Sequence, residues 1–174
     1  MGSLKLICDF VNTADLEDGV DKLNDPQGLQ YWLVFHGLSE LGDRASRADL
    51  ENARTVREAL RELLRANNGV EVDRDSASAI LDDAARRSGL AVRFDDDGIC
   101  FVATARGAAG GVAQVLAAVG ETMADGTWQR LKACRSDTCR WAFIDRARNR
   151  SRQWCDMSVC GNRAKARAFR QRHG

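Results

Sequence analysis

The sequence has few of the features that mark disordered or membrane-spanning chains. It contains one proline in 174 residues, and no apolar run approaches the roughly 18 to 20 residues that a helix needs to cross a bilayer. Because 44% of the residues are hydrophobic and 29% are charged, the chain can build a core, and we expect a folded protein. An acid at Asp9 comes too early for a secretion signal, so we expect a cytoplasmic protein with no membrane partner.

Histidines and phosphate-binding glycine motifs are also scarce, and this bears on catalysis. His36 follows an apolar run and is interpreted as a helix-end or core residue, whereas His173 lies near the end of the chain. Neither lies beside a nucleophile motif, and the glycine-rich residues 107–111 lack both G-x-G-x-x-G spacing and a Walker lysine. We therefore expect no enzyme. An active site in the front part of the chain, positioned by the C-terminal part, stays open as an alternative.

The net charge of +1 hides a strong segregation of charge along the chain. From Arg130 onward there are 13 basic residues and 3 acidic ones, whereas the preceding part has 13 basic and 22 acidic residues. Such a split indicates that the tail meets a polyanion and that the acidic front part has another task.

The front part reads as mostly helical. Helical spacing of apolar residues predicts helices near residues 26–35, 46–66, 77–89 and 112–123, with Ser46 as an N-cap. Two apolar runs, residues 90–94 and 99–104, flank the acidic turn 95–98 and predict a hairpin. No element is assigned to the apolar residues 4–10 or to the polar residues 12–25. The charged face of the 46–66 helix is interpreted as solvated surface, and it carries Arg54, Glu58, Arg61 and Arg65.

Four of the six cysteines form two pairs with C-x4-C spacing, namely Cys134 with Cys139 and Cys155 with Cys160. Two such pairs separated by about 15 to 20 residues predict a Zn²⁺ site, because each tight turn supplies two thiolates. A site with four thiolates has no open position, so its zinc is structural. Two disulfides are the alternative, although they are rare in a reducing compartment. Cys8 and Cys100 are interpreted as small buried apolar residues.

The residues around these cysteines predict the rest of a small module. Between the pairs, aromatic residues at both ends and arginines in the middle predict a hairpin with its tip near residues 147–150. Residues 161–173 predict a helix with Arg163, Arg167 and Arg170 on one face. A knuckle, a hairpin and a helix that starts at the last ligand are a treble-clef arrangement. We expect an α+β protein with a mostly helical domain at residues 1–126 and a treble-clef-like finger at 127–174.

These residues resemble two known families. The CGNR zinc finger is matched over about residues 131–172, through Phe143-Ile144-Asp145, Asn149, Trp154, Met157, Cys160-Gly161-Asn162-Arg163 and Lys165. The ABATE domain that precedes this finger in bacterial proteins resembles the front part, through residues 9–13, Trp32-Leu33 and residues 56–60. Ala147 and Gln153 depart from the finger, where a serine and a basic residue are expected.

The resemblance implies a bacterial, stress-responsive transcription regulator whose finger binds double-stranded DNA. Arginine suits such a partner because its planar, permanently charged fork makes paired hydrogen bonds to phosphate. The candidate nucleic-acid residues are Arg146, Arg148, Arg150, Arg152, Arg163, Lys165, Arg167 and Arg170. A finger that mediates protein contacts, or a basic face without a partner, remains open.

The resemblance also implies signal sensing by the front domain. The candidate site for a small-molecule effector is the polar cluster Asp9, Asn12 and Thr13 with Trp32, and with Tyr31 nearby if the first helix folds back. The alternative is that Asn12 and Thr13 satisfy hydrogen bonds of a turn or a helix cap.

Overall fold

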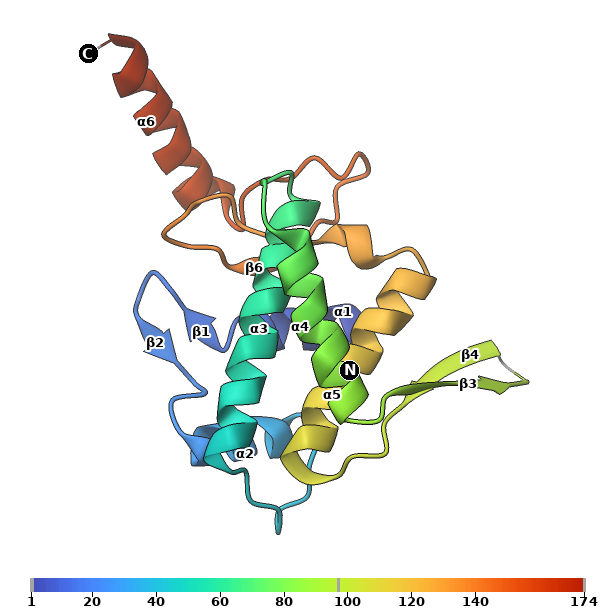
Figure 1. Cartoon of the computed structure of the whole chain (residues 1–174). Helices are drawn as coiled ribbons and strands as arrows, with labels where there is room; N and C mark the ends of the chain where they lie inside the picture. Colours follow the sequence, from blue (N-terminus) through green and yellow to red (C-terminus); the bar gives the residue numbers. More distant parts are fainter. Residues whose placement is uncertain (1, 97, 174) are drawn as a thin grey trace.

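The computed structural model describes residues 2–96 and 98–173, and these form an α+β fold (Figure 1). The helices are α1 (Ser3–Val11), α2 (Pro26–Phe35), α3 (Arg47–Asn67), α4 (Arg74–Arg87), α5 (Gly107–Ala124) and α6 (Asn162–His173), with short helical turns η1 (Trp128–Arg130) and η2 (Met157–Gly161). The strands form three antiparallel hairpins: β1 (Ala14–Asp15) with β2 (Val20–Asp21), β3 (Ala91–Asp95) with β4 (Gly98–Val102), and β5 (Leu131–Ala133) with β6 (Ala142–Ile144).

The predicted helices of the front domain are confirmed, and their ends have local causes. Ser46 accepts a hydrogen bond from the backbone of Asp49, whose carboxylate bonds back to Ser46, so a capping box starts α3. Asp25 caps α2 ahead of Pro26. Gly89 follows the end of α4 with a φ of +60°, a conformation that glycine adopts without the steric cost of a Cβ.

Two segments without an assigned element turn out to be structured. Residues 3–11 form α1, which buries Ile7, Phe10 and Val11 against the core and is thereby stabilised despite its short length. The polar run that follows folds into the small β1–β2 hairpin.

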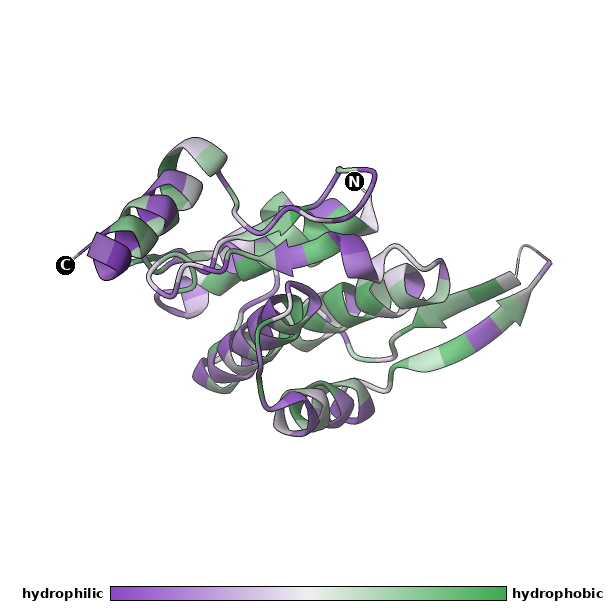
Figure 2. Cartoon of the chain, turned by 90° about the horizontal axis from the view of Figure 1, so that it is seen from above, coloured by the Kyte–Doolittle hydropathy of each residue, from purple (hydrophilic) through white to green (hydrophobic). Residues whose placement is uncertain are grey.

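The predicted β3–β4 hairpin is also confirmed, with Phe94 opposite Ile99 and Val92 opposite Phe101. Of its predicted acidic turn, Asp97 lies outside the described residues. The hairpin projects from the body of the molecule in both views (Figures 1 and 2). Its root is held by Phe101, whose ring lies so close to Gly120 of α5 that an added Cβ would meet it at 2.8 Å.

One core joins the front domain to the start of the finger. It is built around α3, with α1, α2, α4 and α5 contributing apolar faces, and it also contains Leu131, Ala133 and Ala142 of the β5–β6 hairpin. In Figure 2 the helix that ends at the C-terminus, α6, carries many hydrophilic residues, and none of its residues is buried. Within residues 2–96 and 98–173, no helix is both long and apolar enough to cross a membrane.

The structure corrects two sequence interpretations. Arg61 is not solvated. Only 1% of its surface is exposed, because α1 and the finger's knuckle, the turn that joins β5 to β6, cover this side of α3. The hairpin predicted between the cysteine pairs is also wrong, since β6 pairs backward with β5 instead of forward with residues 152–154. The residues after Ile144 form a loop, because the Asp145 side chain is fully buried and its hydrogen bonds hold that loop in an irregular path.

Candidate metal centre and nucleic-acid interface

The four predicted ligands meet in space. The Sγ atoms of Cys134, Cys139, Cys155 and Cys160 all lie within 4.8 Å of one another. Cys139 and Cys155 are 3.5 Å apart and Cys155 and Cys160 are 3.8 Å apart, measured between sulfurs. A tetrahedron with Zn–S bonds of about 2.3 Å has edges of about 3.8 Å, so the arrangement fits Zn²⁺.

The four thiols also influence one another's ionisation. Hydrogen bonds from Cys139 and Cys155 lower the pKa of Cys134, and the same contact raises the pKa of Cys139. Burial raises the pKa of Cys160. One thiolate therefore opposes ionisation of its neighbours, and four thiolates coexist only around a multivalent cation.

The backbone around the site explains how C-x4-C turns present their sulfurs. The first pair lies in the knuckle that joins β5 to β6, where Arg140 adopts the left-handed region with a φ of 48°. In the second pair, Asp156 accepts hydrogen bonds from the backbone of Ser158 and Val159, and the resulting turn η2 delivers Cys160 to the start of α6. Gly161 lies against the thioether of Met157, whose sulfur would be 2.4 Å from an added Cβ.

The loop between the cysteine pairs is organised by Asp145. Its carboxylate accepts a hydrogen bond from Lys132 Nζ at 2.7 Å. It also accepts hydrogen bonds from the backbone N–H groups of Ala147 and Arg152, at 2.9 and 3.0 Å. Burial alone would raise the pKa of Asp145, but these donors lower it. The carboxylate therefore stays ionised and fixes the path of the arginine-rich loop.

The predicted basic residues all have exposed side chains, in two groups at the end of the molecule opposite α2 (Figure 1). One group lies on the loop, namely Arg146, Arg148, Arg150 and Arg152, and the other lies on α6, namely Arg163, Lys165, Arg167 and Arg170. Two of the eight are engaged. Arg152 lies 4.9 Å from the Phe143 ring centre and donates to the carbonyls of Trp154 and Cys155. Arg163 pairs with Glu17 of the β1–β2 hairpin.

Helix α6 has no buried residue and leaves the body of the protein from η2 (Figure 1). Its position is set at one end, where Asn162 donates a hydrogen bond to the carbonyl of Ser158 and Cys160 belongs to the metal site. Within the described part of the chain, Lys165, Arg167 and Arg170 form no ion pair. The metal site thus fixes the direction of a helix on which Lys165, Arg167 and Arg170 are exposed.

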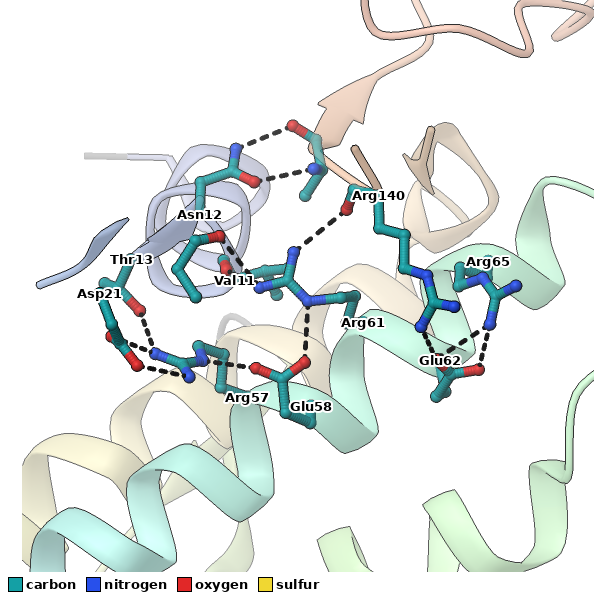
Figure 3. Close-up of polar contacts among 12 residues, drawn as sticks. Val11, Asn12, Thr13, Asp21, Arg57, Glu58, Arg61, Glu62, Arg65 and Arg140 are labelled. Carbon is teal, nitrogen blue, oxygen red and sulfur yellow. Dashed lines mark hydrogen bonds and ion pairs between the residues drawn. The ribbon is translucent and has the colours of Figure 1, made fainter. Parts of the chain in front are cut away.

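A polar network docks the finger's knuckle onto the front domain (Figure 3). The Asn12 side chain donates to the carbonyl of Ala142 at 2.9 Å and accepts from its N–H at 2.8 Å, as a neighbouring strand would. Arg61 donates to the carbonyls of Val11 and Arg140 at 2.7 and 3.1 Å.

The turn after α3 completes this docking. Asn68 donates through its side-chain amide to the carbonyls of Ala133 and Gln153, both at 2.8 Å, and its own carbonyl accepts from Arg135. Sequence reasoning recognised this turn only as a helix stop. The sequence gives no sign of this docking, because the partners of Asn68 lie 65 and 85 residues away in the chain.

The candidate effector residues are partly brought together. Asp9, Asn12 and Trp32 line a cavity of about 940 Å³ between α1, α2 and the finger. Thr13 does not line it: this buried side chain donates to the carbonyl of Phe10 and accepts from Arg57. Sequence reasoning missed Trp141, the finger residue that closes the cavity, because no local pattern links it to α2. Burial lowers the pKa of His36, which also lines the cavity.

Comparison with protein families finds one match for each part of the chain. Residues 130–173 match the family described as "CGNR zinc finger", and residues 4–127 match the ABATE family, described as "Putative stress-induced transcription regulator". Both resemblances are confirmed, and neither description names an enzyme. A search of curated proteins finds no match.

Proposed function

The chain belongs to the ABATE family and ends in a CGNR zinc finger, and on this basis we propose that it is a cytoplasmic transcription regulator that binds double-stranded DNA through the finger. The observation that carries the proposal is the basic helix α6, which has no buried residue and whose direction is fixed by the metal site.

The shape of α6 suits a duplex. Its 12 residues span about 18 Å at 1.5 Å per residue, and a helix of about 10 to 12 Å diameter enters a major groove about 12 Å wide. A helix of this length without a buried face is marginal in water, so a partner that covers it supplies stabilisation. Arg163, Arg167 and Arg170 follow one another at spacings of four and three and therefore share a face toward the phosphates.

The arginine loop supplies a second contact at the same end of the molecule. Arg146 and Arg148 are exposed and form no ion pair within the described residues. Because Asp145 and Lys132 fix the backbone of the loop before a partner binds, binding has to order only the arginine side chains, which lowers its entropic cost.

Salt-dependent binding to duplex DNA tests the proposal. We expect the Arg167→Ala, Arg170→Ala double variant to bind more weakly, and the log–log slope of affinity against salt to flatten by about 0.9 for each phosphate that is no longer neutralised. Fluorescence anisotropy with a labelled random-sequence duplex measures both quantities.

The Arg86→Ala, Arg87→Ala double variant is the control, because it removes the same charge from the exposed end of α4. Equal slopes for all three proteins would contradict the proposal. They would favour the alternative that the finger docks on another protein, which does not require duplex-dependent salt sensitivity.

Replacing Glu17 should change the DNA affinity in the opposite direction. Glu17→Gln releases Arg163, so we expect tighter DNA binding. Asp18→Asn removes the same charge from the same hairpin without releasing an arginine and is expected to have the smaller effect. Equal effects of the two variants would show that Arg163 makes no phosphate contact.

We also propose that the front domain responds to a small-molecule effector bound in the cavity beside Asp9, Asn12 and Trp32. The cavity's volume lies within the range of about 300 to 1,000 Å³ typical of ligand sites.

A further inference from the structure

The cavity is lined by aromatic side chains from two places in the chain, helix α2 with its C-cap and the finger. Trp32 packs against the buried Phe10, with ring centres 5.3 Å apart, and the ring centre of His36 lies 4.1 Å from that of Trp32. Tyr31 and Phe35 stand one helical turn apart on α2, nearly parallel at 23° with ring centres 6.4 Å apart. Trp141 is supplied by the finger.

Two of these aromatic residues are poorly covered by the protein itself. Tyr31 is 74% exposed and Phe35 is 73% exposed, although both line the cavity. Burial of a phenyl or phenol ring is strongly favourable, and ring pairs add to that gain. Exposed rings around a concave surface are therefore suited to bind a flat aromatic molecule, which would stack on them and shield them from water.

The rim of the cavity is polar and comes from the turn between β2 and α2. Lys22, Asn24 and Gln27 are exposed there, and within the described residues their side-chain amide and ammonium groups have no hydrogen-bond partner. Asp25 uses one carboxylate oxygen, Oδ1, to cap α2. The rim thus offers donors and acceptors along one edge, with one acid and one base that balance in charge.

From this arrangement we propose that the cavity binds a flat heteroaromatic compound with hydrogen-bonding groups along one edge, and that the bound compound contacts the front domain and the finger together. The aromatic walls take the ring faces and the β2–α2 rim takes the polar edge. This proposal rests on the effector role proposed above and names the chemical class of the effector.

The contact with the finger follows from Trp141 and its neighbours. Trp141 lies two residues after the ligand Cys139 and packs against the cysteine cluster. The next residue, Ala142, is held by Asn12, which also lines the cavity. A compound stacked on Trp141 therefore adds contacts between α1, α2 and the zinc site, and its binding free energy opposes their separation.

Three bicyclic probes test the chemical class by equilibrium dialysis against the zinc-loaded full chain without DNA. Quinazoline-2,4-dione has a flat ring and a polar edge, naphthalene lacks the polar edge, and tetrahydroquinazoline-2,4-dione lacks one aromatic ring. We expect quinazoline-2,4-dione to bind at least about tenfold more tightly than either analogue. Equal binding of the three probes, or no binding of quinazoline-2,4-dione, would overturn the proposal.

A matched pair of variants locates the site. Phe35→Leu changes a cavity ring and Phe94→Leu changes a ring on the β3–β4 hairpin that is 80% exposed, so neither is expected to unfold the protein. We expect affinity for quinazoline-2,4-dione to fall about 2- to 10-fold in Phe35→Leu only. A weaker affinity in both variants, or in neither, places the compound elsewhere and contradicts the proposal.

Zinc release tests the contact with the finger. We expect saturating quinazoline-2,4-dione to slow the transfer of zinc to a coloured chelator in the natural protein and to have less effect in Phe35→Leu. Binding without a change in zinc release would overturn the joint contact. Because no DNA is present in these assays, their failure is independent of the DNA-binding test above.

Discussion

Arg61 is the largest fully buried side chain in the described part of the chain, and it shows how one residue can join two modules. Its guanidinium reaches the carbonyls of Val11, Ala14 and Arg140, while Nε bonds Glu58 at 2.9 Å (Figure 3). Arginine suits this position because five N–H donors in a fixed plane can serve several acceptors at once.

Replacing this cation tests its role in stability. Arg61→Met has a similar length but removes the donor of three carbonyls and of one Glu58 oxygen, Oε2, so we expect the unfolding free energy to fall by about 3 to 5 kcal/mol. Urea denaturation measures the change. Arg47→Met on the same helix removes an exposed pair with Glu51 and should cost less than about 1 kcal/mol. A similar small cost at Arg61 would contradict the anchoring role.

At the scale of elements, ion pairs hold the small β1–β2 hairpin to α3. Arg57, only 5% exposed, makes paired hydrogen bonds to both oxygens of Asp21 at 2.7 and 3.0 Å and also contacts Thr13 and Glu58. The hairpin in turn places Glu17 beside Arg163 of α6. A hairpin with two-residue strands has little stability of its own, so this pair sets where Glu17 lies.

The Arg57–Asp21 pair gives a pH dependence with a defined sign. Burial opposes ionisation of Asp21, but hydrogen bonds from Arg57 and Leu23 lower its pKa below the usual value. Its ionised form therefore stabilises the fold fully above the unfolded pKa of about 3.9, and the contribution is lost as pH falls through the lower folded pKa.

We expect Asp21→Asn to be less stable than the natural protein by about 1 to 3 kcal/mol at pH 7. This difference should persist to about pH 5 and shrink below about pH 4. Urea titrations of both proteins across this pH range measure the difference in unfolding free energy. Both proteins lose zinc in acid, so this effect cancels in the difference. A difference that is constant down to pH 3 would contradict the assignment.

At the scale of the whole molecule, the zinc finger and the front domain share one hydrophobic core. The β5–β6 hairpin carries Cys134 directly after β5, and its Leu131 and Ala133 pack with the helices of the front domain. The finger is therefore divided: its knuckle belongs to the body, whereas its loop and α6 extend toward solvent (Figure 1).

Zinc removal should consequently destabilise the front domain as well as the finger. We expect chelation to lower the midpoint of helix melting by about 10 °C or more, since a loss of about 4 kcal/mol shifts a chain of this size by roughly 8 to 16 °C. Far-ultraviolet circular dichroism measures the front domain's helices. Cys139→Ser should show the low midpoint with or without chelator, whereas Cys8→Ala should still respond to it. Unchanged helix melting after chelation would show that the two parts are independent.

The sequence alone determined the features that depend on neighbours along the chain. The spacing of Cys134, Cys139, Cys155 and Cys160 was enough to identify the metal site, because each pair is closed by one local turn. The helices α2 to α5 followed from apolar periodicity and their caps, and the β3–β4 hairpin followed from its turn.

Only the tertiary structure determined which polar side chains are buried and which short strands pair. Arg61 and Arg54 have the same predicted place on the charged face of α3. They differ in burial, because α1 and the knuckle cover Arg61 but leave Arg54 partly exposed. Strand β6 had possible partners on both sides in sequence, and buried Asp145 excluded the later one. Burial and pairing depend on groups distant in the chain, and a local pattern does not contain them. For the same reason, the cavity lined by both Trp32 and Trp141 depends on the docking of the finger onto the front domain, which no local pattern encodes.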